Sequence, residues 1–260
     1  MELVVIGLVA LVASGVTLFS GFGLGTVLMP VFALFFPVPL AIAATALVHF
    51  ASNIFKFALM ARQADWRVVA RFSIPAAAMA VVGASLLTMF HRMAPLGSYS
   101  LWGRTFELTV VKTTIGALIV VFALLELWPR FQALALPARW LALGGALSGF
   151  FGGLSGNQGA LRSAFLLKAG LSKEAFVATG VVSAVIVDAV RLLVYGGGFL
   201  VAHLTASREL VAPVLVGTLC AFIGAFVGKR LLKKVTLRAV QLTVAVAMLL
   251  IGVALLAGLI

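Results

Sequence analysis

Long apolar runs separated by short polar stretches make up almost the whole chain. From Leu3 to Phe55 the sequence contains no Asp, Glu, Lys or Arg, which is enough for roughly two membrane crossings of about 20 residues each. Because the runs are continuous and do not alternate with polar residues, they indicate α-helices rather than the strands of a barrel. Eight runs are long enough to span a bilayer: 4–20, 41–61, 69–90, 108–127, 140–154, 175–194, 210–227 and 237–258.

Two further apolar runs, 26–36 and 159–169, are too short to cross. As helices each would rise about 16 Å, close to half of a hydrocarbon core of about 30 Å. Each follows a glycine-containing segment, Ser20-Gly21-Phe22-Gly23-Leu24-Gly25 in the first case and Ser155-Gly156-Asn157-Gln158-Gly159 in the second. The pattern therefore predicts two half-helices or re-entrant arms.

The two short runs occupy equivalent positions in an internal repeat. A shift of 134 residues pairs Gly15 with Gly149, Gly25 with Gly159, Ala41 with Ala175, and Thr45 with Thr179. We expect a first transmembrane repeat over 1–127, a linker over 128–139 that contains Pro129 and Pro137, and a second repeat over 140–260. Paired interrupted helices are typical of a transport site.

The predicted fold class is all-α: a polytopic transmembrane helical bundle of about eight spanning helices, built from two sequence repeats that each contain a glycine-broken half-helix. Composition agrees, because 63% hydrophobic and 10% charged residues do not suit the surface of a soluble chain of 260 residues. The net charge of +12 fits basic loops held on the cytoplasmic side, so no nucleic acid partner is expected. The polar insert between His91 and Glu107 is expected to be a solvated loop, with a gating or partner surface as the alternative.

The glycine breaks are candidate anion sites. In a bilayer an unpaired backbone group costs several kcal/mol, so a break is tolerated only where it is buried or faces a watery cavity. The half-helices would present free N–H groups and the positive end of a helix dipole, which suits an anion. Close helix packing is the alternative role for the glycines. The substrate-binding candidates at the breaks are Gly21, Gly23, Gly25, Thr26, Gly156, Asn157, Gln158 and Gly159, with Arg162 as a positive anchor.

A polar stripe follows each break. At 100° per residue, Thr45, His49 and Asn53 fall on one helix face together with Ser52 and Lys56, and we expect that face to point into the protein. Thr179 and Ser183 repeat the positions of Thr45 and His49. A hydroxyl bonded only to the backbone carbonyl one turn earlier is the alternative for the threonines, and a packing role is the alternative for His49.

Asp188 and Arg191 are the candidate coupling residues. They are three residues apart and can pair on one helix face, which lowers the cost of burying both charges. An intramembrane carboxylate can also carry a proton, so both roles stay open for Asp188. Arg162 needs a counter-charge, which would be Asp188 or a bound anion, unless it extends to the membrane surface.

The sequence predicts neither a metal site nor a cofactor. His49, His91 and His203 lack ligand spacing, and the single cysteine, Cys220, cannot form a thiolate cluster alone. No positioned nucleophile with its base is evident, so no catalytic residue and no enzyme activity are expected.

The chain resembles the TauE/SafE family of sulfite and organosulfonate exporters. The resemblance is carried by Gly21-Phe22-Gly23-Leu24-Gly25 with Ala44-Thr45, by Gly152-Gly153-Leu154-Ser155-Gly156 with Ala178-Thr179, and by Pro213, Gly217, Gly224 and the turn Lys229-Arg230-Leu231-Leu232. It implies export of small sulfur oxyanions, or related anions, across a bacterial inner membrane. Asn157, Gln158 and Arg162 depart from the family pattern and leave room for a larger or doubly charged anion.

We therefore expect a multi-pass secondary transporter in the bacterial inner (plasma) membrane that exports a small anion by alternating access. Sulfite, sulfoacetate or a similar compound is the expected substrate, and Asp188 would carry protons if transport is coupled to them. A homodimer is also compatible with the sequence. A passive anion channel and a non-transporting membrane subunit are the alternatives.

Overall fold

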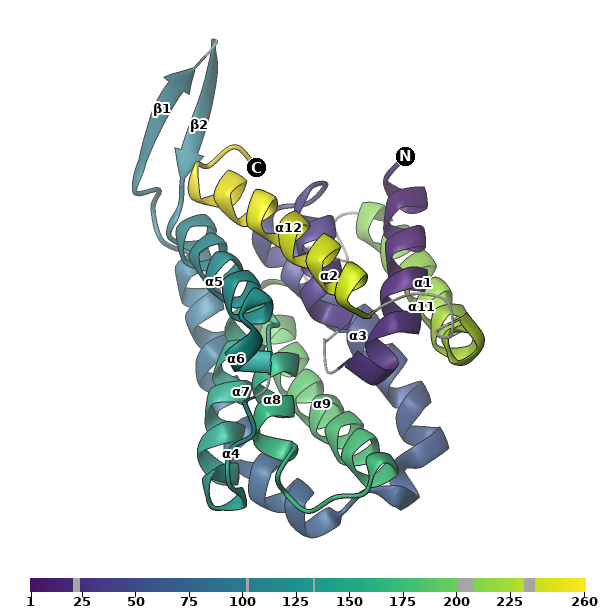
Figure 1. Cartoon of the computed structure of the whole chain (residues 1–260). Helices are drawn as coiled ribbons and strands as arrows, with labels where there is room; N and C mark the ends of the chain where they lie inside the picture. Colours follow the sequence, from purple (N-terminus) through teal and green to yellow (C-terminus); the bar gives the residue numbers. More distant parts are fainter. Residues whose placement is uncertain (21–23, 102, 133, 201–207, 232–236) are drawn as a thin grey trace.

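The computed structural model describes residues 1–20, 24–101, 103–132, 134–200, 208–231 and 237–260. Its long helices follow the apolar runs closely, and Figure 1 shows their arrangement together with two strands. In the first half they are α1 (Glu2–Ser20), α2 (Leu24–Ala33), α3 (Val38–Met60), η1 (Ala61–Gln63), α4 (Trp66–His91), β1 (Gly97–Leu101), β2 (Arg104–Leu108) and α5 (Val110–Leu127). In the remainder they are α6 (Pro129–Gln132), η2 (Ala138–Trp140), α7 (Leu141–Ser155), α8 (Gly159–Leu166), α9 (Lys173–Tyr195), η3 (Gly196–Leu200), η4 (Arg208–Leu210), α11 (Val211–Leu231) and α12 (Leu237–Leu256).

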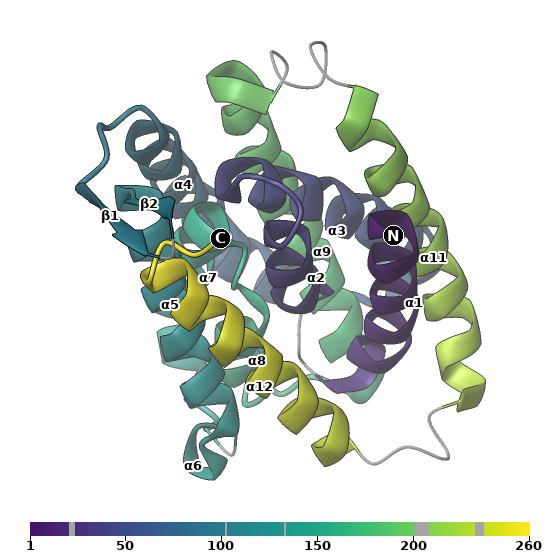
Figure 2. The same cartoon turned by 90° about the horizontal axis from the view of Figure 1, so that it is seen from above.

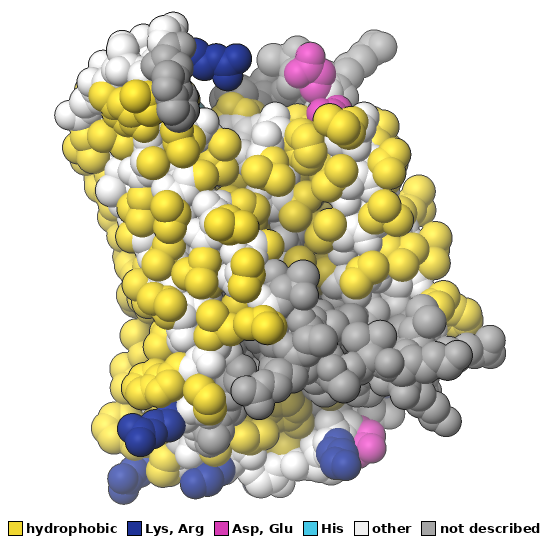
Figure 3. Space-filling view, turned by 45° about the horizontal axis from the view of Figure 1, so that its top comes forward, with side chains coloured by type: hydrophobic (Ala, Val, Ile, Leu, Met, Phe, Trp, Pro, Cys, Tyr) yellow, Lys and Arg dark blue, Asp and Glu magenta, His cyan; other side chains and the backbone are white. Residues whose placement is uncertain are grey.

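The prediction of a helical membrane protein is confirmed. Among the described residues, four helical segments are long and apolar enough to cross a membrane: Val38–Gln63, Trp66–His91, Val110–Leu127 and Lys173–Gly198. Shorter apolar helices cover Glu2–Gly15, Leu24–Ala33, Val211–Val227 and Val244–Leu256. On the face drawn in Figure 3, hydrophobic side chains form a band, and the Lys, Arg, Asp and Glu side chains gather at its two ends. The count of eight spans remains a prediction.

The helices pair between the two halves of the chain. α1 packs against α11, α4 against α7, and α5 against α12, while α3 and α9 contact each other in the middle (Figure 2). The short helix α2 packs against both α1 and α3. As a result, the segment that follows the first glycine break lies inside the bundle.

The α4 and α7 helices approach very closely because α7 has glycine at every fourth position of one face. A methyl group built on Gly149 would lie 2.0 Å from the carbonyl oxygen of Ala76, and Gly145 and Gly153 meet the backbone of α4 in the same way. Small residues at such an interface allow backbones to approach, and in lipid this packing is the main force between helices. Close helix packing therefore accounts for these three glycines.

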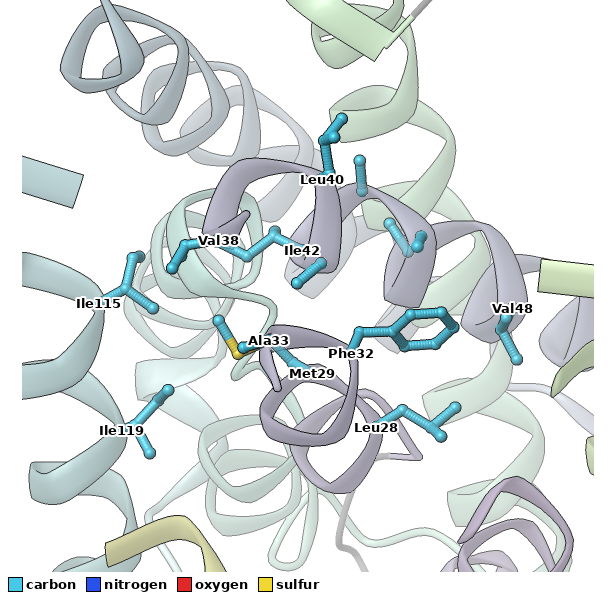
Figure 4. Close-up of a cluster of buried hydrophobic side chains, with 14 of the residues drawn as sticks. Leu28, Met29, Phe32, Ala33, Val38, Leu40, Ile42, Val48, Ile115 and Ile119 are labelled. Carbon is cyan, nitrogen blue, oxygen red and sulfur yellow. The ribbon is translucent and has the colours of Figure 1, made fainter. Parts of the chain in front are cut away.

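The buried face of α2 forms part of a core that also includes α3 and α5. Leu28 and Phe32 of α2 are fully buried, as are Ile42 of α3 and Ile115 of α5. Figure 4 shows these side chains arranged around α2 within one buried cluster. Lipid tails are as apolar as these residues, so exclusion from water does not explain why α2 stays in the protein interior. The close packing of the side chains holds it there.

The polar insert between α4 and α5, which was expected to be a solvated loop, contains two strands. This segment forms an antiparallel β-hairpin in which Gly97 pairs with Leu108 and Leu101 with Arg104, and its turn places Gly103 at a φ of 73°. Tyr99 stacks on Phe106, with ring centroids 5.4 Å apart. Alternation of aromatic and polar residues, with period two, favours strands here. The hairpin lies beside the C-terminal end of the chain (Figure 1), where the Tyr99 hydroxyl donates to the Ala257 carbonyl at 2.5 Å.

Candidate anion site

The segments that follow the two breaks meet in the centre of the bundle. A methyl group built on Gly25, in the first turn of α2, would lie 3.5 Å from the carbonyl oxygen of Gly156. The same position is 3.7 Å from His49 Cδ2 and 3.7 Å from Thr45 Cγ2, both on α3. Gly21 and Gly23 lie outside the described residues. Gly25 is therefore the point where α2, α3 and the second break come together.

The second break has a defined backbone geometry. α7 ends at Ser155, and Gly156 adopts a left-handed conformation with φ of 83° while its N–H donates to the Gly152 carbonyl at 3.1 Å. α8 then starts at Gly159. The first amides of a helix have no acceptor within it. Gly159 thus lies at the end of α8 where the N–H groups of the first turn and the helix dipole favour an anion, while the Gln158 N–H donates to the Gly156 carbonyl at 3.1 Å.

Asp188 is the centre of a buried network that joins three helices. Its Oδ1 forms an ion pair with Arg191 Nη2 at 2.7 Å and accepts a hydrogen bond from Gln158 Nε2 at 3.0 Å. Its Oδ2 lies 2.5 Å from His49 Nδ1. Asp188 and Arg191 are both fully buried. The predicted pairing of Asp188 with Arg191 is present in the structure. The carboxylate also contacts His49 of the polar stripe on α3 and Gln158 of the second break.

His49 and Asn53 occupy the same face of α3, as the stripe predicts. The amide nitrogen of Asn53 lies 3.1 Å from His49 Nδ1 and 3.2 Å from Nε2. Because Nδ1 faces the carboxylate of Asp188, Nε2 is the nitrogen left to accept from Asn53. The imidazole is therefore held between a carboxylate and an amide donor.

Arg191 and two residues that the sequence did not predict, Tyr195 and Ser148, fix the second break. Arg191 Nη1 donates to the Gly152 carbonyl at 3.1 Å, and the Tyr195 hydroxyl donates to the next carbonyl, that of Gly153. The Ser148 hydroxyl donates to the carbonyl of Gln158 at 3.0 Å. Tyr195 lies four residues after Arg191, so helical spacing from Asp188 could have indicated it. Nothing local in the sequence singles out Ser148.

Arg162 does not pair with the carboxylate that was its expected counter-charge. Its Nη1 lies 3.4 Å from the amide oxygen of Gln158, and its Nε is 3.6 Å from the position of a methyl group built on Gly180. Within the part of the chain that the structure describes, the ion pairs of Asp188 are those with His49 and Arg191. Gln158 thus bridges the two, because its amide nitrogen donates to Asp188 and its oxygen accepts from Arg162.

Two polar side chains beside the breaks are buried without a partner. Thr45 is 1% exposed and Asn157 is 5% exposed, and Thr45 Oγ1 and Asn157 Nδ2 have no hydrogen-bond partner among the described residues. Leaving a buried polar group unsatisfied costs about 1–3 kcal/mol. The hydroxyl and the amide can both donate to an oxyanion. Thr26, in the first turn of α2, is also buried.

Thr179 and Ser183 have partners within the protein instead. Thr179 Oγ1 accepts from the backbone N–H of Asp65 at 3.0 Å. The Ser183 hydroxyl donates to the Thr179 carbonyl at 2.8 Å and accepts from the hydroxyl of Ser73 at 2.9 Å. These contacts fasten α9 to α4, so the second-repeat equivalents of Thr45 and His49 serve helix packing in this structure.

The described residues contain no cluster of His, Cys, Asp and Glu that could hold a metal ion.

Comparison with known proteins identifies the family of the chain. No curated protein matches the chain. A family model described as sulfite exporter TauE/SafE matches residues 6–255, nearly the full length. The chain therefore belongs to the TauE/SafE sulfite exporter family, a family of membrane transporters.

Proposed function

We propose that this protein is a secondary transporter that exports a sulfur oxyanion or an organosulfonate, such as sulfite or sulfoacetate, across a bacterial inner membrane by alternating access. The observation that carries the proposal is the close approach of Gly25 to the Gly156 carbonyl, together with the unpartnered Thr45 hydroxyl and Asn157 amide nitrogen beside the breaks. An oxyanion placed there would accept hydrogen bonds from both side chains. Membership of the exporter family supports the chemical class.

The charges around this position favour an anion over a cation. Arg191 and Arg162 lie near the second break, and Asp188 is the one carboxylate that the described contacts place with them. Asp188 is already engaged by Arg191 and by His49. A cationic substrate would find no free carboxylate in these contacts, whereas an anion would offset the excess positive charge.

The helix pairs support a bundle of two related repeats. Under the shift that aligns Gly25 with Gly159, α4 corresponds to α11 and α1 corresponds to α7. The contact of α4 with α7 is then the counterpart of the contact of α11 with α1, and α5 with α12 and α3 with α9 join equivalent helices. We propose that one repeat moves against the other around the central site, as in other transporters built from repeats.

We propose that His49 and Asp188 couple transport to protons. The two side chains share a 2.5 Å hydrogen bond inside the bundle, and histidine is the side chain whose ordinary titration falls near neutral pH. A proton gained by His49 would add a positive charge next to the Asp188 carboxylate. The affinity of the site for an anion would therefore change. Replacing His49 by Gln keeps a hydrogen-bonding group at this position but removes its titration, so the variant should lose the dependence on a pH gradient.

Flux through the purified protein in liposomes tests the proposal. Uptake of sulfite, sulfate, thiosulfate, sulfoacetate and acetate would be measured with and without a pH gradient, and protein-free liposomes provide the control. Selective flux of one sulfur anion that accelerates with the gradient is the expected result. Fast flux that does not depend on the pH gradient and saturates only at high anion concentration would favour an anion channel. Absence of flux for all five anions would contradict the proposal.

A further inference from the structure

Six exposed cations lie at the end of the molecule where α3 ends and α4 begins. They come from η1, the first two turns of α4, η2, the segment after α8 and the start of α9: Arg62, Arg67, Arg71, Arg139, Lys168 and Lys173. We call this group the basic face. None of the six forms an ion pair within the part of the chain that the structure describes. The carboxylates of the same segments are Asp65, whose side chain caps α4, and Glu174, so positive charge is in excess.

Hydrophobic packing brings three of these segments together. Val68 of α4, Ala138 of η2 and Ala169 after α8 all pack against one buried cluster. Each of them is next to a cation of the basic face in the sequence. An isolated parallel bridge also pairs Pro137 with Lys168. Cations from three separate parts of the chain therefore share one end of the bundle.

The start of α9 and the short helix η1 belong to the same end. The backbone N–H of Asp65, just before α4, donates to Thr179 Oγ1 on α9 at 3.0 Å. Lys173 lies six residues before Thr179 on this helix, which is about 9 Å along its axis. Arg62 lies in η1, three residues before Asp65. Both cations are therefore close to the start of α4.

Two exposed indoles lie among these cations. Trp66, the first residue of α4, is 56% exposed, and Trp140 is 44% exposed. The guanidinium carbon of Arg139 lies 5.8 Å from the centre of the Trp140 ring. Tryptophan is enriched where a membrane meets water, because its ring suits the lipid and its N–H suits the headgroup layer. The indoles therefore place the basic face at the level of the lipid headgroups.

The opposite end of the bundle provides a comparison. The 26 residues of α4 separate its two ends by about 38 Å. Arg92 follows the last residue of α4, and Arg104 lies on the hairpin; both are exposed. Strand β2 also carries the exposed carboxylate of Glu107. Cations of the same type are thus present at both ends, but far from one another.

We propose that the basic face binds the headgroups of anionic phospholipids, with Arg139 and Lys168 at its centre. A lipid phosphate accepts charge-assisted hydrogen bonds from guanidinium and ammonium groups, and the indoles of Trp66 and Trp140 pack against the lipid below it. A lipid bound here joins the ends of α4, α8 and α9, so it stabilises the folded bundle. This inference does not depend on which anion the protein transports.

The test compares the wild-type protein with the double variant Arg139→Gln/Lys168→Gln in detergent. Phosphatidylglycerol or the zwitterionic phosphatidylcholine is added, and native mass spectrometry measures the bound lipid while a melting curve reports stability. Phosphatidylglycerol should bind the wild type more tightly than phosphatidylcholine and raise its melting temperature more. The double variant should bind phosphatidylglycerol roughly 30-fold more weakly, because two cations near an anionic headgroup are lost. High salt should weaken binding to the wild type in the same direction.

Arg92→Gln/Arg104→Gln is the matched control, because it removes two exposed cations at the other end of the bundle. It should keep the wild-type response to phosphatidylglycerol. Arg139→Lys/Lys168→Arg keeps both charges and should also bind as the wild type does. Glycerol phosphate, a headgroup without acyl chains, should raise the melting temperature less than phosphatidylglycerol.

Four results would overturn the proposal. They are equal binding of the two lipids by the wild type, an unchanged affinity in Arg139→Gln/Lys168→Gln, an equal loss in Arg92→Gln/Arg104→Gln, and an equal stabilisation by glycerol phosphate. The single variants Arg139→Gln and Lys168→Gln are measured alongside. If neither they nor the double variant fold, the two cations have a structural role and the lipid-binding surface is rejected.

Discussion

His49 Nδ1 and Asp188 Oδ2 lie 2.5 Å apart, although their residues belong to opposite halves of the chain. This hydrogen bond connects α3, which follows the first break, to α9, which follows the second. Asp188 also accepts a hydrogen bond from Gln158 in the second break and forms an ion pair with Arg191 on its own helix. One carboxylate therefore holds together the helices that surround the candidate anion site.

Asp188→Asn should weaken both the fold and transport. The substitution leaves the guanidinium of Arg191 buried without its counter-charge, and breaking a buried ion pair in this way costs about 3–5 kcal/mol. We expect a clear drop in the melting temperature in detergent and loss of anion flux. Glu174→Gln is the control, because Glu174 is an exposed carboxylate in the first turn of the same helix. A melting temperature equal to that of the wild type would show that the network does not stabilise the bundle.

Thr45→Val should reduce anion binding without loss of stability. Valine has nearly the shape of threonine, and the hydroxyl that it removes has no hydrogen-bond partner among the described residues. We expect an unchanged or higher melting temperature and weaker binding, by about tenfold for one lost hydrogen bond to a charged group.

Ser52→Ala is the control for Thr45→Val. Ser52 is also on α3, is buried, and has a hydroxyl without a partner in the described part of the chain. Its removal should affect binding little. If the two variants bind sulfite or sulfoacetate equally well, Thr45 does not contact the anion.

Arg162→Leu should impair transport and leave the fold intact. The described hydrogen bond of Arg162 is a 3.4 Å contact with the amide of Gln158, so little protein structure depends on its charge. An apolar residue of similar length avoids burying a charge in the bundle. Loss of flux with an unchanged elution profile and melting temperature is expected. Transport at the wild-type rate would rule out Arg162 as the positive anchor.

Gly156→Ala should disturb the second break. A side chain at φ of 83° costs about 1–2 kcal/mol for residues other than glycine. The added methyl group would also lie 3.1 Å from Arg191 Nη1. We expect a lower melting temperature and slower flux.

Gly97→Ala serves as the comparison for Gly156→Ala. Gly97 starts strand β1, has no positive φ, and has no atom within 4 Å of the position of a new methyl group. This variant should behave as the wild type. Equal melting temperatures for the two glycine variants would show that the left-handed turn at Gly156 is not required.

The sequence by itself determined the membrane class, the positions of the helices and the residues of the polar stripe. These properties are local, because about twenty consecutive apolar residues define a membrane helix and a period of 3.6 defines its faces. The short runs 26–36 and 159–169 accordingly appear as the short helices α2 and α8. The sequence predicted a polar loop where the structure has the hairpin around Tyr99, whose strands are only five residues long.

The tertiary structure decided which polar groups meet. The internal repeat placed Thr45 and Thr179 at equivalent positions, yet Thr45 faces the breaks while the hydroxyl of Thr179 accepts a hydrogen bond from the backbone of Asp65. The tertiary structure also pairs the Asp188 carboxylate with His49 and Arg191, whereas Arg162 hydrogen-bonds to the amide oxygen of Gln158. In lipid, hydrophobicity places a helix in the membrane but does not select its neighbours, which depend on close packing and on contacts between residues far apart in the chain.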